Sequence, residues 1–308
     1  MKGLNQRKEA AVAGRIARLL SRQTPERPEV TAAVTQLTHL AEAQPDLRQA
    51  AALQAACIRA MYAAPAPISP PTLTAEEAAA RLTGGMPLLR NLPLPCDAHH
   101  LRAVFLRLCE AACTVLDTET HLYEILAAAV SQRHLDPWTL GNVLLTGTAQ
   151  ALPGQLEAQG YPTDLVMTLL RLALLPFLEQ VTPPLTPLRA NQPWSHGYCP
   201  TCGAWPVLAE QRGLEQMRYL RCGLCAASWE VDRLWCPFCA NRDHTMLGYL
   251  YVEGEEQKQR VATCDACQSY VKLRSTLTPF TPLQLLVEEL ALLHLDLIAM
   301  EKGYVSPA

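Results

Sequence analysis

Several features that would assign a function directly are absent from this 308-residue sequence. It has no glycine-rich phosphate loop and no nucleophile elbow, so neither phosphate binding nor serine-hydrolase chemistry is indicated. No run reaches the ~18 uncharged apolar residues that span a bilayer; the best candidate, Leu283 to Met300, contains Glu288, Glu289, His294 and Asp296. Charge of one sign is not in excess either, because 26 Lys and Arg stand against 29 Asp and Glu. This balance argues against a nucleic-acid or anionic-membrane partner.

A secretory signal is absent as well. The first twenty residues begin with basic side chains, but Gly14, Arg15 and Arg18 interrupt the apolar core that a signal would need. The stretch is typical of an amphipathic helix instead. We therefore expect a cytoplasmic protein without membrane insertion, in which thiols stay reduced and paired cysteines favour metal binding over disulfides.

The first half of the chain is rich in Ala and Leu at helical spacing. One buried helix face is predicted by apolar residues at i, i+3, i+4 and i+7, namely Leu101, Val104, Phe105, Leu108 and Ala112. Helix starts are expected at residues 136–137 and 161–164, and proline and glycine mark the breaks. Residues 1–180 are thus predicted to form an irregular bundle of about seven to nine helices.

Different patterns follow. Four prolines at positions 183, 184, 187 and 193 predict an extended, semi-rigid linker over residues 181–193. Short apolar runs at 205–208, 246–252 and 270–273 predict strands, with a hairpin turn at Gly254. A closing helix is predicted from Pro282 to Lys302, ended by Gly303.

Twelve cysteines are the unusual feature of the composition. Eight of them form four Cys-x-x-Cys pairs, separated by 19, 10 and 24 residues: Cys199/Cys202, Cys222/Cys225, Cys236/Cys239 and Cys264/Cys267. One tight turn aims two such sulfurs at a single ion, and a second pair that follows a hairpin completes a tetrahedron. The long gaps suit hairpins, so we pair the motifs consecutively. The first two pairs form site 1 and the last two form site 2; an interleaved pairing, first with third and second with fourth, is the alternative.

The predicted fold class is therefore α + small β. An all-helical domain at 1–180 and the linker at 181–193 precede two tandem four-cysteine metal modules of the rubredoxin or zinc-ribbon kind. These modules occupy residues 194–232 and 233–275, and a C-terminal helix lies within 276–308.

The predicted sites have no open coordination position. A tetrathiolate that is closed around its ion neither binds substrate nor activates water, so metal-dependent hydrolysis is not indicated. Zinc is the default occupant and iron uses the same four thiolates. Residues 194–275 carry as many basic as acidic side chains, and eight thiolates with two divalent ions bring the segment to a net charge of −4. Such a segment is poorly suited to phosphate backbones.

Other polar residues and cysteines are interpreted as structural. Core packing is expected for Cys57, Cys96, Cys109 and Cys113. The His99–His100 pair is expected to be exposed at a helix start that Asp97 caps. His196 and His244 flank the cysteine motifs and are expected to face solvent or donate to sulfur. Three carboxylates of the closing helix, Glu288, Glu289 and Asp296, are assigned to its solvated face. No catalytic residue is proposed.

The cysteine-rich half resembles the family of the formate dehydrogenase accessory protein FdhE. The resemblance covers about 110 residues and is carried by CPTCGAWPV, RYLRCGLCAASWEV, WCPFC, CDACQSYVK and LDLIAMEKGY. It implies a cytoplasmic protein that is needed for active formate dehydrogenase and that associates with the catalytic subunit before export. It also implies two rubredoxin-like sites on the eight cysteines, holding iron rather than zinc. Ala240 and Gln268 depart from the family by replacing glycine after a second cysteine, which predicts a strained turn in site 2.

These observations favour a non-enzymatic maturation factor, a chaperone-like protein whose metal ions supply folding energy. One alternative is an iron redox protein with one-electron centres that acts during maturation. A second alternative is a four-cysteine zinc ribbon that binds nucleic acid.

Overall fold

The computed structural model describes residues 27–146, 151–190 and 192–307. The amphipathic helix expected within residues 1–20 lies outside them. Eight α-helices precede the first strand in the described residues, within the predicted range. Their bounds are α2 Pro28–Ala43, α3 Arg48–Tyr62, α4 Ala75–Thr83, α5 Ala98–Val115, α6 Thr120–Ser131, α7 Pro137–Thr146, α8 Leu152–Ala158 and α9 Thr163–Arg189, with a short 3₁₀ turn, η1, at Pro45–Leu47.

Helix α5 is the centre of the helical half and packs against α3, α6, α7 and α9. Its five predicted face residues are all buried, as the i, i+3, i+4, i+7 spacing requires. The Asp97 side chain accepts the His100 N–H at 2.9 Å and so caps the first turn, as expected. The predicted helix starts at Pro137 and Thr163 are also confirmed.

The prediction of an extended linker over 181–193 is wrong for residues 181–189, because α9 continues to Arg189 through three of the prolines. Each internal proline removes a helical hydrogen bond. Tertiary contacts outweigh that loss: Val181 and Leu185 are buried in the core. The end of the helix is also fixed to the cysteine-rich half, since the Thr182 hydroxyl donates to the Cys225 carbonyl at 3.1 Å. Helix α9 therefore crosses the predicted boundary at residue 180.

Helix α9 is also long and apolar enough to cross a membrane, which makes it a stronger candidate than Leu283 to Met300. However, 56% of its apolar window is buried inside the structure. The same length and composition are found in core helices, and the packing of α9 against α3, α4, α5, α7 and α8 places it in that role.

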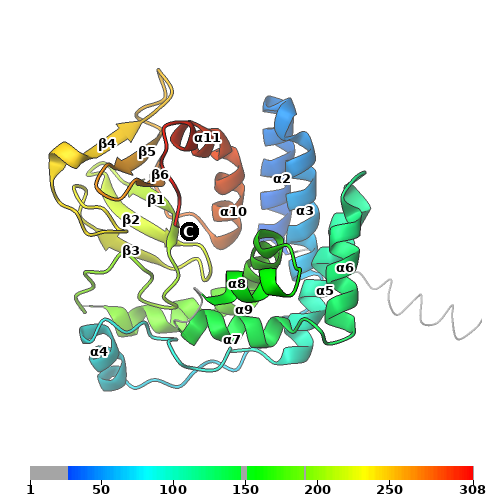
Figure 1. Cartoon of the computed structure of the whole chain (residues 1–308). Helices are drawn as coiled ribbons and strands as arrows, with labels where there is room; N and C mark the ends of the chain where they lie inside the picture. The colour runs from blue at the N-terminus through cyan, green and yellow to red at the C-terminus, as the bar shows by residue number, and fades with distance from the viewer. Residues whose placement is uncertain (1–26, 147–150, 191, 308) are drawn as a thin grey trace, which may run out of the picture.

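Six strands form one sheet in the order β3-β2-β1-β6-β5-β4. Their bounds are β1 Pro206–Arg212, β2 Met217–Cys222, β3 Ser228–Val231, β4 Leu247–Leu250, β5 Gln259–Cys264 and β6 Ser269–Thr276, with a 3₁₀ turn, η3, at His244–Met246. Each predicted ribbon is an antiparallel meander, β1–β3 or β4–β6. Parallel pairing of β1 with β6 joins the two ribbons, so the tandem modules share one sheet (Figure 1).

The closing helix is broken into α10 Pro282–Ala291 and α11 Leu293–Glu301, where one helix was predicted. The break lies at Leu292, which is fully buried. It lets α10 pack against α2, α3 and β1 while α11 packs against β4, β5 and β6. Helix α10 thus lies between the sheet and the α2–α3 pair (Figure 1). Gly303, at φ 87°, follows α11 as predicted.

Candidate metal centres

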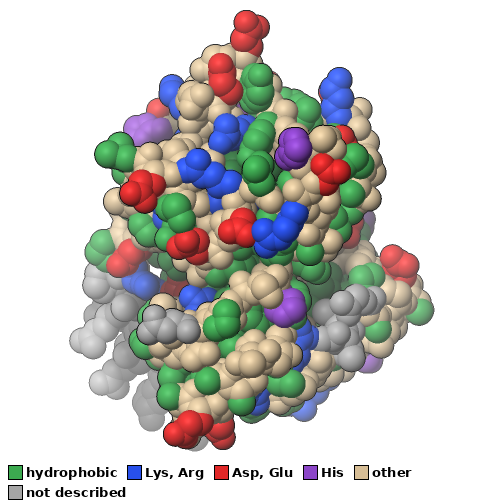
Figure 2. Space-filling view, turned by 90° about the vertical axis from the view of Figure 1, so that its left-hand side faces the viewer, with side chains coloured by type: hydrophobic (Ala, Val, Ile, Leu, Met, Phe, Trp, Pro, Cys, Tyr) green, Lys and Arg blue, Asp and Glu red, His purple; other side chains and the backbone are tan. Residues whose placement is uncertain are grey.

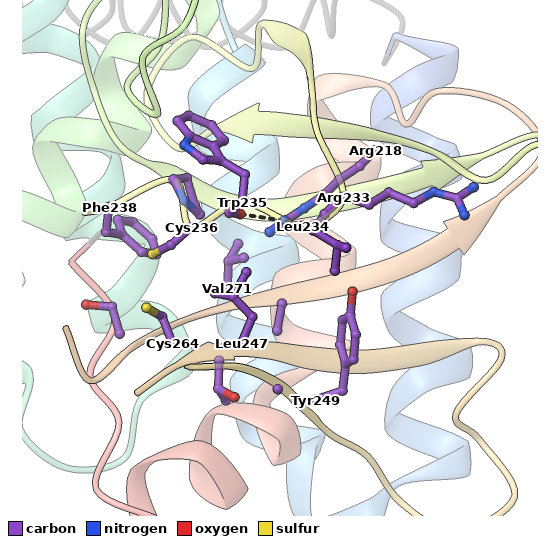
Figure 3. Close-up of a pocket in the computed structure, with 15 residues that line it drawn as sticks. Arg218, Arg233, Leu234, Trp235, Cys236, Phe238, Leu247, Tyr249, Cys264 and Val271 are labelled. Carbon is purple, nitrogen blue, oxygen red and sulfur yellow. Dashed lines mark hydrogen bonds between the residues drawn. The ribbon is translucent and has the colours of Figure 1, made fainter. Parts of the chain in front are cut away.

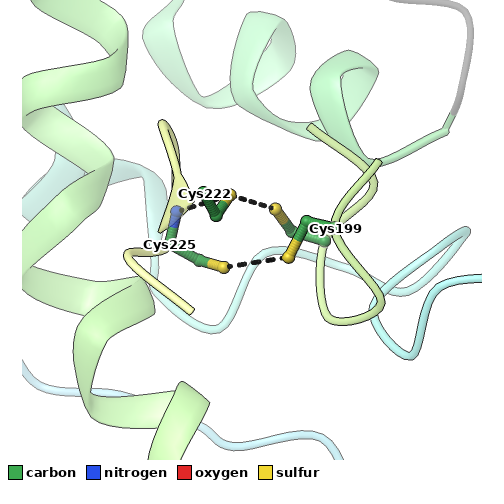
Figure 4. Close-up of side chains that lie close together, drawn as sticks. Cys199, Cys222 and Cys225 are labelled. Carbon is green, nitrogen blue, oxygen red and sulfur yellow. Dashed lines mark hydrogen bonds between the residues drawn. The ribbon is translucent and has the colours of Figure 1, made fainter. Parts of the chain in front are cut away.

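The four cysteines of site 1 meet between the helical half and the sheet. Cys199 and Cys202 precede β1, while Cys222 ends β2 and Cys225 follows it. The Sγ atoms of Cys199 and Cys225 are 3.7 Å apart, and those of Cys202 and Cys222 are 3.3 Å apart (Figure 4). All four side chains are fully buried. Four sulfurs that lie within 4.8 Å of one another form a compact, closed ligand set.

Backbone hydrogen bonds shape each turn of site 1 around its sulfurs. The Thr201 N–H points at Cys199 Sγ at 3.3 Å, and the N–H groups of Leu224 and Cys225 point at Cys222 Sγ at 3.3 and 3.4 Å. Donors directed at a sulfur favour its thiolate form. Two residues between the thiols therefore do what the spacing predicts: one turn presents both sulfurs, and its backbone N–H groups point at the first of them.

The helical half holds site 1 from outside. The N–H groups of Leu88 and Leu89 donate to the carbonyls of Pro200 and Thr201 at 2.9 and 2.8 Å. The Tyr198 hydroxyl donates to the Gly85 carbonyl at 2.8 Å. Arg189, at the end of α9, donates to the Ser228 carbonyl at 3.0 Å. These contacts from distant segments explain why water is excluded from site 1.

Site 2 gathers Cys236, Cys239, Cys264 and Cys267 at the other meander. The Sγ pairs Cys236/Cys267 and Cys239/Cys264 are each 3.7 Å apart, and all four sulfurs lie within 4.8 Å of one another. Cys236 and Cys264 are buried, and Figure 3 shows their side chains on neighbouring elements. Cys239 is exposed and Cys267 is half-buried. Site 2 is therefore open to solvent on one side, whereas site 1 is closed.

The structure thus brings the eight predicted ligands together in consecutive pairs and not in the interleaved arrangement. None of the sulfur pairs is a disulfide, because every Sγ–Sγ distance above exceeds the ~2.05 Å of an S–S bond. A tetrahedral site with metal–sulfur bonds of ~2.3 Å has sulfur–sulfur edges of ~3.8 Å. Three of the four distances are 3.7 Å and the fourth is shorter, so both ligand sets fit a tetrathiolate-bound ion of the size of zinc or iron.

The thiols of site 1 titrate as an interacting group. Burial by itself raises the pKa of Cys199, but hydrogen bonds with Cys202, Cys222 and Cys225 bring it well below the ordinary value. The pKa values of Cys202 and Cys222 are raised well above it, first by burial. A cation bound at this site would replace the remaining protons and stabilise all four sulfurs as thiolates.

All four turns contain a left-handed residue directly after the second cysteine. Gly203 has a φ of 88°, while Ala226, Ala240 and Gln268 have φ values of 55°, 61° and 53°. The strained positions predicted at Ala240 and Gln268 are thus confirmed, and Ala226 adds a third that was not foreseen. A left-handed backbone costs a non-glycine residue ~1–2 kcal/mol.

The remaining cysteines and the histidines are placed mostly as expected. Cys57, Cys96 and Cys109 are buried, and burial raises the pKa of Cys57 to about 11 and that of Cys96 and Cys109 to about 12. Cys113 is half-buried. His196 stacks on Tyr198, with ring centroids 4.9 Å apart, and His244 is exposed. No group of metal ligands among the described residues includes a histidine.

The assignment of the three C-terminal carboxylates to a solvated face is wrong. Asp296 accepts hydrogen bonds from Lys272 at 2.6 Å and from the Tyr270 hydroxyl at 2.8 Å. Glu288 pairs with Arg274 at 3.1 Å, and Glu289 pairs with Arg171 of α9. These side chains face the sheet and α9, because α10 is packed between elements and the exposed side of α11 is formed by Leu293, Leu297 and Met300 instead.

Sequence reasoning also missed a set of buried charges near the sites. Glu210 is fully buried and pairs with Arg221, which is 3% exposed, and with Arg212. Arg218 is equally buried. Charged side chains rarely face a core. The sequence of β1 and β2 alone therefore does not predict that these charges are buried, and the pairing of the two strands must be known first.

Comparisons with known proteins agree with the geometry. A model of the FdhE central domain matches residues 198–233, which contain site 1. "Protein FdhE homolog" of Stutzerimonas stutzeri is 39% identical over 110 residues, covering 34% of this chain and 35% of that one. "Protein FdhE" of Escherichia coli is 34% identical over 119 residues, covering 38% and 37%. The chain thus aligns with little more than a third of the length of these relatives.

One solved structure extends the likeness to nearly the whole chain. The crystal structure of the FdhE protein from Pseudomonas aeruginosa matches with a TM-score of 0.60 and 23% identity, covering 92% of this chain and 94% of that one. The described residues therefore define a helical scaffold that carries two four-cysteine clusters on a shared sheet. The resemblance to the FdhE family is confirmed as a similarity: residues 198–233 match the FdhE central domain, and the fold is similar to that of a solved FdhE protein.

Proposed function

We propose that this protein is a non-enzymatic accessory factor for formate dehydrogenase, which binds the catalytic subunit in the cytoplasm before export. The similarity to FdhE supports the assignment. The observation that carries it is the gathering of eight sulfurs into two compact groups of four. A closed tetrathiolate supplies structure and no catalytic position. This arrangement suits a protein that presents a surface to a partner.

We infer that each group holds one ion, with Cys199, Cys202, Cys222 and Cys225 as ligands at site 1 and Cys236, Cys239, Cys264 and Cys267 at site 2. Iron is favoured by the resemblance and zinc is the alternative. When bound, the ion supplies folding free energy by joining turns that are far apart in the sequence. The helical half then determines how far solvent reaches each ion, because it covers site 1 and leaves site 2 open to solvent on one side.

The partner surface is proposed beside site 2. Tyr249 of the edge strand β4 is 40% exposed, and Tyr251, two positions further on, is 53% exposed. Leu234, which lines the same cavity as Tyr249, is 56% exposed. Aromatic side chains are enriched where interfaces gain most of their affinity. The Trp residues near the clusters are less available, because Trp229 and Trp235 are buried. We therefore assign recognition to the tyrosines rather than to the tryptophans.

Capture of the formate dehydrogenase catalytic subunit tests this proposal. The tagged full-length protein should retain that subunit from cells that express it, and the double variant Tyr249→Ala/Tyr251→Ala should retain markedly less. Leu214→Ala is the matched control, since Leu214 is 96% exposed at the turn between β1 and β2 and lies outside the proposed surface. Consistent absence of the subunit from native complexes would refute the proposal.

A redox role is a second candidate that the exposure of Cys239 favours, because electron exchange needs access to the ligands. It requires iron and a reversible absorbance change on reduction. Protein purified without oxygen that contains only zinc would exclude it. This candidate is compatible with the accessory role, in which the centre reports or delivers electrons during maturation.

We expect no nucleic-acid partner. On the side of the molecule where β4 lies, basic and acidic side chains are interspersed among the described residues (Figure 2). Binding to a phosphate backbone needs clustered Lys and Arg and weakens steeply with salt. Retention on DNA or RNA that falls steeply with salt would favour the nucleic-acid alternative instead.

A further inference from the structure

A small cavity lies beside site 2, between the sheet and the segment that connects β3 to η3. We call residues 232–243 the crossover segment. The cavity encloses about 30 Å³ and is lined by Cys236 and Cys264 of site 2, by Trp235 of the crossover segment and by Arg218 of β2 (Figure 3). Its volume leaves room for roughly two water molecules.

Arg218 is the unusual member of this lining. Its side chain is 3% exposed, and its Nη1 donates to the carbonyls of Arg233 and Trp235 at 3.2 and 3.0 Å. Its Nε and Nη2 are buried and have no hydrogen-bond partner. Among the described residues, no ion pair joins Arg218 to a carboxylate. A buried guanidinium without an anion is costly, so its charge calls for a compensating negative group.

Arg221, the other buried arginine of β2, differs from Arg218 in how its charge is compensated. Arg221 is also 3% exposed, but its charge is compensated by the fully buried Glu210. Arg218 has no such carboxylate and instead shares its cavity with two ligands of site 2. Four thiolates around a divalent ion carry a net charge of −2, and around a trivalent ion −1. The missing anion is therefore present once site 2 is loaded.

We propose that Arg218 is the counter-charge of the metal centre at site 2, and that its bonds to the Arg233 and Trp235 carbonyls couple metal loading to the position of the crossover segment. The inference rests on metal binding as proposed above and assigns Arg218 a positioning and electrostatic role. Loss of the positive charge weakens site 2 and leaves site 1, whose nearest buried arginine is already neutralised, unchanged.

A chelator titration of the full-length, zinc-loaded protein under reducing conditions tests this. Alkylation of freed thiols followed by mass spectrometry reports the protection of each cysteine, so the two sites are followed separately. Arg218→Gln, which keeps a hydrogen-bond donor but no charge, should lose site 2 at a chelator concentration at least ~10-fold lower, as removal of outer-shell partners does elsewhere. Arg218→Lys should stay within about threefold of the wild type, because it keeps the charge.

Arg242→Gln is the control, since Arg242 pairs with Asp232 at the surface and has a side chain 63% exposed. It should match the wild type at both sites. Equal losses in Arg218→Gln and Arg218→Lys, or equal weakening of sites 1 and 2, would assign Arg218 a packing role and overturn the proposal. So would a wild-type site 2 that weakens in buffer free of small carboxylates and recovers with acetate, because an external anion would then be the counter-charge. Absence of protection at both sites in the wild type would refute metal binding itself.

Discussion

Gly197 lies where the two metal-site loops touch, and its replacement by alanine is a stringent test of that contact. A Cβ atom built on Gly197 would lie 1.7 Å from the Pro237 carbonyl oxygen and 2.4 Å from its carbonyl carbon. Real Cβ atoms essentially never approach another atom within 3.0 Å, so the two backbones must separate by more than an ångström. Pro237 lies between Cys236 and Cys239, and a shift of this turn therefore distorts site 2.

The loss of stability in Gly197→Ala depends on the kind of atom that the new Cβ meets. Overpacking typically costs ~1–3 kcal/mol, and the upper end applies here because the clash is with backbone of a proline and not with a mobile side chain. A loss of ~3 kcal/mol corresponds to a decrease in Tm of roughly 5 °C for a chain of this size, from the usual entropy of unfolding per residue. Thermal unfolding followed by circular dichroism, together with the metal content per chain, measures both effects.

Gly154→Ala is the matched control for Gly197→Ala. Gly154 lies within α8, and no heavy atom is within 4 Å of a Cβ built on it. Alanine there should be neutral or stabilising by up to ~1 kcal/mol, because it lowers the entropy lost on helix formation. A Gly197→Ala protein that melts with the wild type and keeps full metal content would show that the two loops are not in contact, and the described junction would be wrong.

Four further predictions concern the sites and the core. Replacing Cys199 and Cys202 together by Ala should remove about one ion per chain and leave site 2 loaded, because site 1 then lacks two of its four ligands. Elemental analysis measures the metal content, and equal loss of both metals would contradict the consecutive pairing. Gln268→Gly should raise the free energy of unfolding by roughly 1 kcal/mol, because φ is 53° there, and a denaturant titration that shows no gain would argue against strain. Brief alkylation of the native protein should modify Cys239 first, since it is the exposed ligand; initial modification within site 1 would contradict its burial. Burial raises the pKa of the Glu179 carboxyl, so its contribution to folding weakens as the pH rises through that pKa. Glu179→Gln should therefore reduce the decrease in Tm that accompanies a rise in pH above the ordinary pKa of a glutamate, and an unchanged pH profile of Tm would contradict this.

The features that the sequence predicted correctly are local ones. A capped helix with its apolar stripe, such as α5, depends on residues within a few turns of one another. The same is true of a Cys-x-x-Cys turn, whose two sulfurs and left-handed residue lie within five positions. Consecutive pairing of these turns also followed from short distances along the chain, since each gap is spanned by one hairpin.

The features that were missed depend on contacts between distant segments. Parallel pairing of β1 with β6 joins residues more than 60 positions apart, and nothing in either strand specifies it. Helix α9 tolerates Pro183, Pro184 and Pro187 near its end because that end is held by the cysteine-rich half. Asp296 is acidic on a helix that looks amphipathic, yet it pairs with Lys272 of the sheet. In each case a tertiary contact outweighs the local preference.

X-ray absorption at the metal edge, combined with elemental analysis of protein purified without oxygen, tests most directly whether the eight cysteines bind two metal ions. We expect two ions per chain, each surrounded by four sulfur atoms at ~2.3 Å and by no nitrogen or oxygen ligand. Protein that folds fully with no bound metal, or a shell in which fewer than four sulfurs surround each ion, would contradict the assignment of these eight cysteines and the accessory role that is built on it.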